Sequence, residues 1–180
     1  MSARVRVAVV VSAAVSLAGW RTRALTGRGA VAATAVGTGV IGGCSWPGAV
    51  VLGTFFVSAS GLSRLARPSP VAAKGSRRDE RQVLANGAVA AVAALLGGRI
   101  DRRLGLGMAA GALAAATADT WATEIGSTSR QTPRLIISGR FVERGASGAV
   151  TSRGSLAALC GSAVVAAVTG IVSDLSSNAK

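Results

Sequence analysis

The sequence predicts an all-α fold: a polytopic integral membrane helical bundle of about six short transmembrane helices, in one membrane domain that covers residues 1–180. Half of the residues are apolar, and the mean hydropathy is +0.50. Long runs contain no charged residue, and the longest of them, Gly29–Ser63, has 35 residues. Because a bilayer core about 30 Å thick needs about 20 apolar residues per helix, such runs predict membrane spans.

The charge-free runs predict where each helix begins and ends. The longest run is too long for one span and breaks at the turn-forming stretch Gly42–Gly48. Runs of 14 to 17 residues span the bilayer with the help of flanking arginines that reach the interface. The first run also resembles a signal peptide, but it lacks a clear cleavage site, so a retained helix is favoured. The expected helices cover residues 5–20, 29–44, 47–63, 83–98, 104–122 and 154–173.

The net charge of +13 is interpreted first as a topology signal. Of the 20 basic residues, 14 fall in the connections 21–28, 64–82 and 127–153, which lie on one side if every helix crosses the membrane. Cytoplasmic loops carry an excess of Lys and Arg, so we expect these loops on the cytoplasmic face of the cell membrane. Nucleic acid, the usual partner of so basic a chain, is not expected, because only 15% of the residues are charged.

Some classes of chemistry are excluded by composition. The chain has no His, which excludes histidine acid–base chemistry and Ser-His-Asp triads. The pairs Gly39-x-x-x-Gly43 and Gly107-x-x-x-Gly111 predict close contacts between helices. The stretch Gly37–Gly42 matches a dinucleotide-binding fingerprint in its letters, but no acidic residue follows at the required distance. Its glycines are therefore interpreted as packing residues.

Two acidic residues, Asp119 and Glu124, stand at the end of the fifth apolar run. Carboxylates are costly at a membrane, so we expect them to be functional. On a straight helix they lie about 140° apart, so they share a site only between helices or where the helix ends. Such oxygen ligands suit Mg²⁺ bound together with substrate phosphates, which makes both residues catalytic and metal-binding candidates. The alternative is that Asp119 pairs with an arginine in the core.

A segment that is first basic and then amide-bearing leads into the fourth expected helix. Its basic residues are Lys74, Arg77 and Arg78, and its amide-bearing residues are Gln82 and Asn86. If the helix begins at Arg77, then Arg78, Gln82 and Asn86 share one stripe that runs from the interface into the bilayer. Such a stripe would bind phosphate with arginine and orient a ligand with its amides. An anionic-lipid patch, with Asn86 hydrogen-bonded between helices, is an equally supported alternative.

A third polar segment precedes the last expected helix. Gly145, Ser147, Gly148 and Thr151 offer backbone N–H groups near a helix N-terminus, where anions bind. The segment has no lysine and is therefore not a P-loop, and an ordinary loop or helix cap is the alternative. Under the expected topology, all three polar segments lie at the cytoplasmic ends of the helices.

These motifs resemble the integral membrane family of transmembrane protein 19, catalogued as domain of unknown function 92. The likeness rests on Lys74-x-x-Arg77-Arg78-x-x-x-Gln82-Val83-Leu84-Ala85-Asn86-Gly87, Ala118-Asp119-Thr120-Trp121-Ala122-Thr123-Glu124-Ile125-Gly126, Pro133-Arg134-Leu135-Ile136 and Gly145–Gly154. It implies a multi-pass helical membrane protein. Plant and cyanobacterial members are phytyl-phosphate kinases, and the family is distantly similar to CTP-dependent polyprenol kinases and CDP-diacylglycerol synthases.

The chain departs from the family pattern in two places. Ala149 replaces the second glycine of the family's glycine-rich loop, which predicts a poorer approach to phosphate because alanine tolerates positive φ badly. Family members also continue with further helices that carry an Asp-Ser-Leu-Leu-Gly-like segment and an Asn-Asp pair. The sequence here stops at Lys180, which predicts a shortened member.

The leading hypothesis is a prenyl (phytyl) phosphate kinase that transfers a phosphoryl group from a nucleotide triphosphate such as CTP to an isoprenoid monophosphate. Asp119 and Glu124 would hold Mg²⁺, Arg77 and Arg78 would neutralise developing charge, and the other polar residues named above would bind the donor. The alternative is a non-catalytic membrane protein that binds anionic lipid or a partner, or an inactive truncated member. A small transporter is disfavoured because the polar residues gather at one interface.

Overall fold

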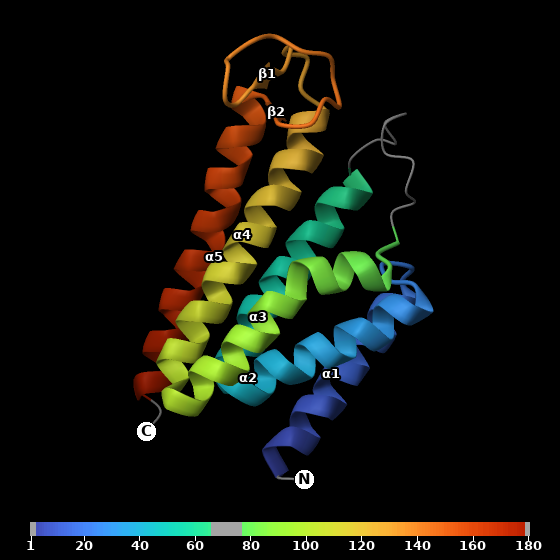
Figure 1. Cartoon of the computed structure of the whole chain (residues 1–180). Coiled ribbons are helices and arrows are strands. Elements are labelled where there is room, and N and C mark those ends of the chain that lie inside the picture. Colours follow the sequence, from blue (N-terminus) through green and yellow to red (C-terminus); the bar gives the residue numbers. More distant parts are fainter. Residues whose placement is uncertain (1–2, 66–76, 179–180) are drawn as a thin grey trace.

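The computed structural model describes residues 3–65 and 77–178, which form five α-helices and one two-stranded sheet (Figure 1). The helices are α1 (Ala3–Arg21), α2 (Gly27–Leu65), α3 (Glu80–Ile100), α4 (Arg102–Ser127) and α5 (Ser152–Asn178), and the antiparallel strands are β1 (Arg134–Leu135) and β2 (Ala149–Val150). Within the described residues, α1, α2, α3 and α5 are long and apolar enough to cross a membrane. The all-α membrane bundle expected from the sequence is therefore confirmed.

The second and third expected helices are the two halves of α2, which a break at Ser45 separates, so the five named helices contain all six expected helical segments. Ser45, with φ 63° and ψ −153°, interrupts the helix. Pro47 follows in the first turn of the second half, where its missing N–H would have had no helical partner. A straight helix of 39 residues would be about 58 Å long, about twice the hydrocarbon core. The break at Ser45 lets α2 reverse its direction (Figure 1).

Helix α3 begins at Glu80, three residues before the expected start at residue 83, so the condition that the helix begins at Arg77 is not met. The Asp79 carboxylate accepts a hydrogen bond from the Gln82 N–H at 2.9 Å, and the Gln82 side chain accepts one from the Asp79 N–H at 3.3 Å. This reciprocal capping box satisfies two backbone donors that would otherwise lack partners at the helix start. Arg78 consequently lies in the connection before α3 and is free to pair with another segment.

Removal of this cap is expected to weaken the bundle measurably. Asp79→Ala should lower the free energy of unfolding by about 1 kcal/mol, because the N–H groups at the start of α3 lose their acceptor. Thermal or denaturant unfolding of the purified protein in detergent measures the change. Arg81→Ala, at an exposed position in the same turn, is the control, and an equal effect of the two substitutions would contradict the role of Asp79.

Close contact between α2 and α3 depends on glycine. A Cβ on Gly43 would collide with the backbone carbonyl of Ala94, and a Cβ on Gly98 would lie 2.5 Å from the carbonyl oxygen of Gly43. A Cβ on Gly39 would lie 2.9 Å from the Cβ of Ala91. The structure therefore confirms Gly39-x-x-x-Gly43 as a packing motif. By contrast, Cβ atoms on Gly107 and Gly111 would have no described atom within 4 Å.

Within the described residues, the connections with the most basic residues lie at the ends of the helices away from the chain termini (Figure 1). Both termini lie at one end, and β1 and β2 lie at the other (Figure 1). The Arg64 guanidinium donates a hydrogen bond to the Thr22 carbonyl at 2.9 Å, which joins the α1–α2 connection to the end of α2. At the opposite end, Arg103 donates to the Ser177 hydroxyl at 2.8 Å. The cytoplasmic location of the basic end remains the prediction made from charge.

Candidate functional site

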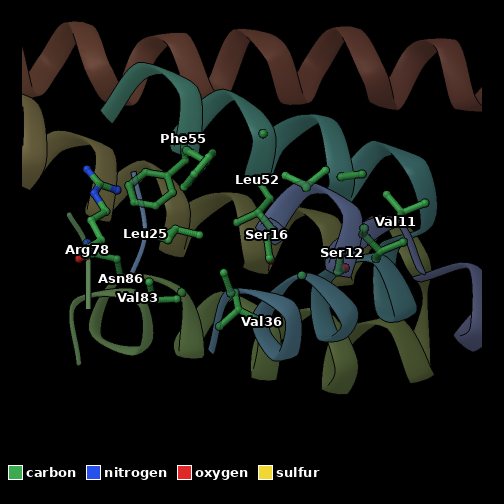
Figure 2. Close-up of a pocket in the computed structure, with 18 of the residues that line it drawn as sticks. Val11, Ser12, Ser16, Leu25, Val36, Leu52, Phe55, Arg78, Val83 and Asn86 are labelled. Carbon is green, nitrogen blue, oxygen red and sulfur yellow. The ribbon is translucent and has the colours of Figure 1, made fainter. Parts of the chain in front are cut away.

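An elongated cavity of about 140 Å³ lies between α1, both halves of α2 and the start of α3 (Figure 2). Its wall is mostly apolar. In Figure 2, Arg78 and Asn86 lie near one end beside Phe55, whereas Ser12 and Val11 lie toward the other end. The cavity therefore combines a hydrocarbon-like interior with a cationic end.

Arg78 is fixed at this end by backbone pairing with the α1–α2 connection. Its N–H donates to the Ala24 carbonyl at 2.9 Å, and its carbonyl accepts from the Thr26 N–H at 3.0 Å. The guanidinium carbon lies 5.6 Å from the centroid of the Phe55 ring, within the range of a cation–π contact. Burial lowers the pKa of Arg78, and the negative charge of Glu124 opposes that shift. Since the guanidinium does not deprotonate in proteins, this end of the cavity keeps its positive charge.

The predicted stripe of Arg78, Gln82 and Asn86 does meet in the cavity wall, although Arg78 precedes the helix. The Gln82 side chain is engaged in the capping box, whereas the Asn86 carboxamide has no hydrogen-bond partner within the described part of the chain. Arg77 does not line the cavity. It is exposed, and its guanidinium donates to the Leu25 carbonyl at 3.0 and 3.3 Å. Lys74 lies outside the described residues.

The two acidic candidates, Asp119 and Glu124, lie on different faces of α4. Glu124 is half-buried and accepts a hydrogen bond from the Ser63 hydroxyl at 2.6 Å, and its charge acts on Arg78. Asp119 is exposed, and it forms no ion pair with an arginine in residues 3–65 and 77–178. Because α4 is helical through both positions, the carboxylates point about 140° apart.

This arrangement does not bring the two carboxylates together as a preformed magnesium site. Over the described ranges, no three His, Cys, Asp or Glu side chains gather in a way that would hold a metal ion. Magnesium needs only one or two protein carboxylates when substrate phosphates supply further ligands. Of the two candidates, Glu124 is the one whose charge acts on the cationic end of the cavity.

The expected phosphate loop lies away from the cavity, in the segment between α4 and α5. Gly145 and Gly148 have φ values of 89° and 75°, which glycine adopts without strain. The Thr151 hydroxyl accepts from the Gly154 N–H at 3.1 Å and caps α5, and Ser147 is exposed. Ala149 lies in β2 and does not have a positive φ, so the expected penalty for alanine at this position does not arise.

Sequence reasoning missed the apolar and α1 parts of the cavity. Phe55 and Leu25 carry no local signal of function, since aliphatic and aromatic residues are common throughout the spans. Ser12 and Ser16 offered a weak signal, two hydroxyls four residues apart in an apolar helix. The Ser12 hydroxyl is buried without a hydrogen-bond partner among the described residues.

Comparison with known proteins places the chain among integral membrane proteins. A family model described as integral membrane protein DUF92 matches residues 10–179. The uncharacterized membrane protein MJ0933 of Methanocaldococcus jannaschii is 29% identical over 164 residues, which cover 90% of this chain and 68% of that protein. Protein PGR of Arabidopsis thaliana is 30% identical over 177 residues, which cover 88% of this chain and 61% of Protein PGR. The chain thus spans about two thirds of these relatives. No solved structure matches it.

Proposed function

The chain belongs to the integral membrane protein family DUF92, and from this membership and the cavity we propose that it binds an isoprenoid monophosphate and transfers a phosphoryl group to it from a nucleotide triphosphate. The observation that carries the proposal is the cavity that ends at Arg78. A guanidinium binds phosphate through paired N–H donors, while an apolar wall takes a hydrocarbon chain. Both parts of an isoprenoid phosphate therefore find matching surroundings.

The size of the cavity limits what it holds. An aliphatic cavity of about 150 Å³ accepts one benzene-sized group. The volume of about 140 Å³ therefore suits the part of the chain next to the phosphate, and the remainder would lie between the helices or in the bilayer. Asn86, whose carboxamide has no partner among the described residues, adds a donor near the phosphate end.

The proposed reaction needs positioning and charge neutralisation rather than histidine. An oxygen of the lipid phosphate attacks the terminal phosphorus of the donor, the bond to the bridging oxygen breaks, and a nucleoside diphosphate leaves. Arg78 would stabilise the charge on the lipid phosphate and on the transferred group. Mg²⁺ would enter with the donor phosphates, and Glu124 is the carboxylate that would contact it. Support for the transfer step comes from the resemblance of the motifs to those of phytyl-phosphate kinases.

The proposal is tested with purified full-length protein, CTP or ATP, Mg²⁺, and phytyl or geranylgeranyl phosphate. We expect an isoprenoid diphosphate product. Arg78→Gln should lower the rate by about 100-fold, the usual loss when one stabilising contact to the transferring group is removed. Arg81→Gln, an exposed arginine outside the cavity, is the control. If folded wild-type protein forms no isoprenoid diphosphate, the proposed kinase activity is wrong.

A second candidate function is favoured by the separation of Asp119 and Glu124. If the two carboxylates do not hold a magnesium ion together, the protein would bind a phosphorylated lipid in the same cavity without changing it. In that case, wild-type protein retains labelled phytyl phosphate, and Arg78→Gln does not, while no diphosphate forms with any donor. Binding and product formation, measured on the same preparation, therefore distinguish the two functions.

A further inference from the structure

An open groove of about 800 Å³ lies at the end of the bundle that carries β1 and β2, away from the cavity described above. It runs between the cap, defined as residues 128–151, and the first two turns of α5. Its residues include Arg134 and Phe141 from the cap, and Ser152, Ser155, Leu156 and Leu159 from α5. None of its lining residues lines the cavity at Arg78.

Along α5, the lining of the groove changes from polar to apolar. Its first part offers the hydroxyls of Ser152 and Ser155 at a helix N-terminus, where the helix dipole favours negative charge. The next turn offers Leu156 and Leu159, which are 61% and 68% exposed on a helix long and apolar enough to span the membrane. The polar part therefore lies toward the membrane surface, and the apolar part lies toward the hydrocarbon.

Charge in and around the groove favours an anion. Arg134 lines it, and none of the described lining residues carries a carboxylate. The cap contains four arginines and one acidic residue, Glu143. The Arg134 guanidinium stacks over the Phe141 ring, 4.3 Å from its centroid. Stacking uses the face of the guanidinium and leaves the N–H donors on its edge for another partner.

The cap also presents apolar side chains beside this cation. Ile136 and Ile137 are 71% and 97% exposed in the turn that follows β1. Basic residues interspersed with exposed aliphatic residues are typical of protein surfaces that bind the headgroup layer of an anionic membrane. The cap is positioned for this contact because it joins the ends of α4 and α5.

We propose that the groove binds an anionic phospholipid of the surrounding bilayer, with its phosphate at Arg134 and Ser152 and an acyl chain along Leu156 and Leu159. The site goes beyond the proposed function, because it uses other residues and a bilayer lipid instead of a substrate. The bound lipid would attach the cap to the membrane surface and stabilise its packing on α5.

The test measures the melting temperature of the full-length protein in detergent with added phosphatidylglycerol, phosphatidylcholine or inorganic phosphate. A ligand that binds the folded state raises the melting temperature. We expect phosphatidylglycerol to raise it by several degrees and the other two additions to leave it unchanged. Arg134→Gln should abolish the shift, whereas Arg130→Gln, in the cap but outside the groove, should retain it.

A second variant keeps the test decisive if Arg134→Gln is itself unstable. Leu159→Asn removes the apolar contact for the acyl chain and leaves the cation in place, and it should also lose the shift. An equal shift with phosphatidylcholine, or a shift that persists in both variants, would overturn the proposal. Protection by inorganic phosphate equal to that by phosphatidylglycerol would identify a site for soluble phosphate instead. Arg78→Gln should keep the shift, which separates this test from that of the proposed function.

Discussion

Gly53→Leu is expected to abolish binding of phytyl phosphate, and with it product formation, while the bundle stays folded. Gly53 lines the cavity on the second half of α2, and a Cβ at this position would meet no atom within 4 Å. A leucine side chain meets no obstacle at this position, and because Gly53 lines the cavity of about 140 Å³, we expect the leucine to take space that the lipid would use. Glycine inside a helix costs about 0.5–1 kcal/mol relative to alanine, so stability should be unchanged or higher.

Gly61→Leu is the matched control for this prediction. It makes the same replacement on the same helix at another open position, which does not line the cavity. Retention of labelled phytyl phosphate and formation of the diphosphate are measured for both variants, together with the melting temperature. If a well-folded Gly53→Leu protein retains as much labelled phytyl phosphate as the wild type does, the cavity is not the lipid site.

Gly43→Ala is expected to destabilise the bundle strongly. The added Cβ would collide with the backbone carbonyl of Ala94, and a backbone atom cannot move aside by changing a rotamer. Overpacking of a tight contact costs about 1–3 kcal/mol, and α2 and α3 can separate only by giving up packing along their shared contact. We expect a clearly lower melting temperature in detergent and a lower yield of folded protein.

Gly111→Ala provides the comparison for Gly43→Ala. Both are glycines within helices and in G-x-x-x-G spacing, but Gly111 faces open space. Alanine there should be neutral or should add up to about 1 kcal/mol of stability through its higher helix propensity. If Gly43→Ala and Gly111→Ala have the same effect on the melting temperature, the tight α2–α3 contact is wrong.

The candidate site was partly predictable from sequence. The spacing of Arg78, Gln82 and Asn86 placed the three side chains together, and they do line one cavity. The spacing did not show that Asp79 caps a helix that begins at Glu80. Arg78 therefore precedes the helix and pairs with Leu25, 53 positions earlier in the chain. The apolar walls of the cavity could not be predicted from the sequence either, because the sequence around a leucine or phenylalanine is similar whether the side chain faces lipid or a cavity.

The class of the protein and the approximate extent of its helices follow from the amino-acid sequence. Hydropathy and the absence of charge are local properties, and a bilayer requires long apolar helices, so the spans follow from composition along the chain. The break near Ser45 was predictable for the same reason, since glycine, proline and length all oppose one straight helix.

Which of two similar glycine motifs packs against another helix depends on the arrangement of the helices in space. Gly39-x-x-x-Gly43 packs against α3, whereas Gly107-x-x-x-Gly111 meets no described atom. Likewise, Glu124 is hydrogen-bonded to Ser63, which lies 61 residues earlier, and Asp119 on the same helix is exposed. A helix has several faces of similar composition, and which face is buried depends on neighbours distant in sequence. That choice is therefore absent from any local pattern.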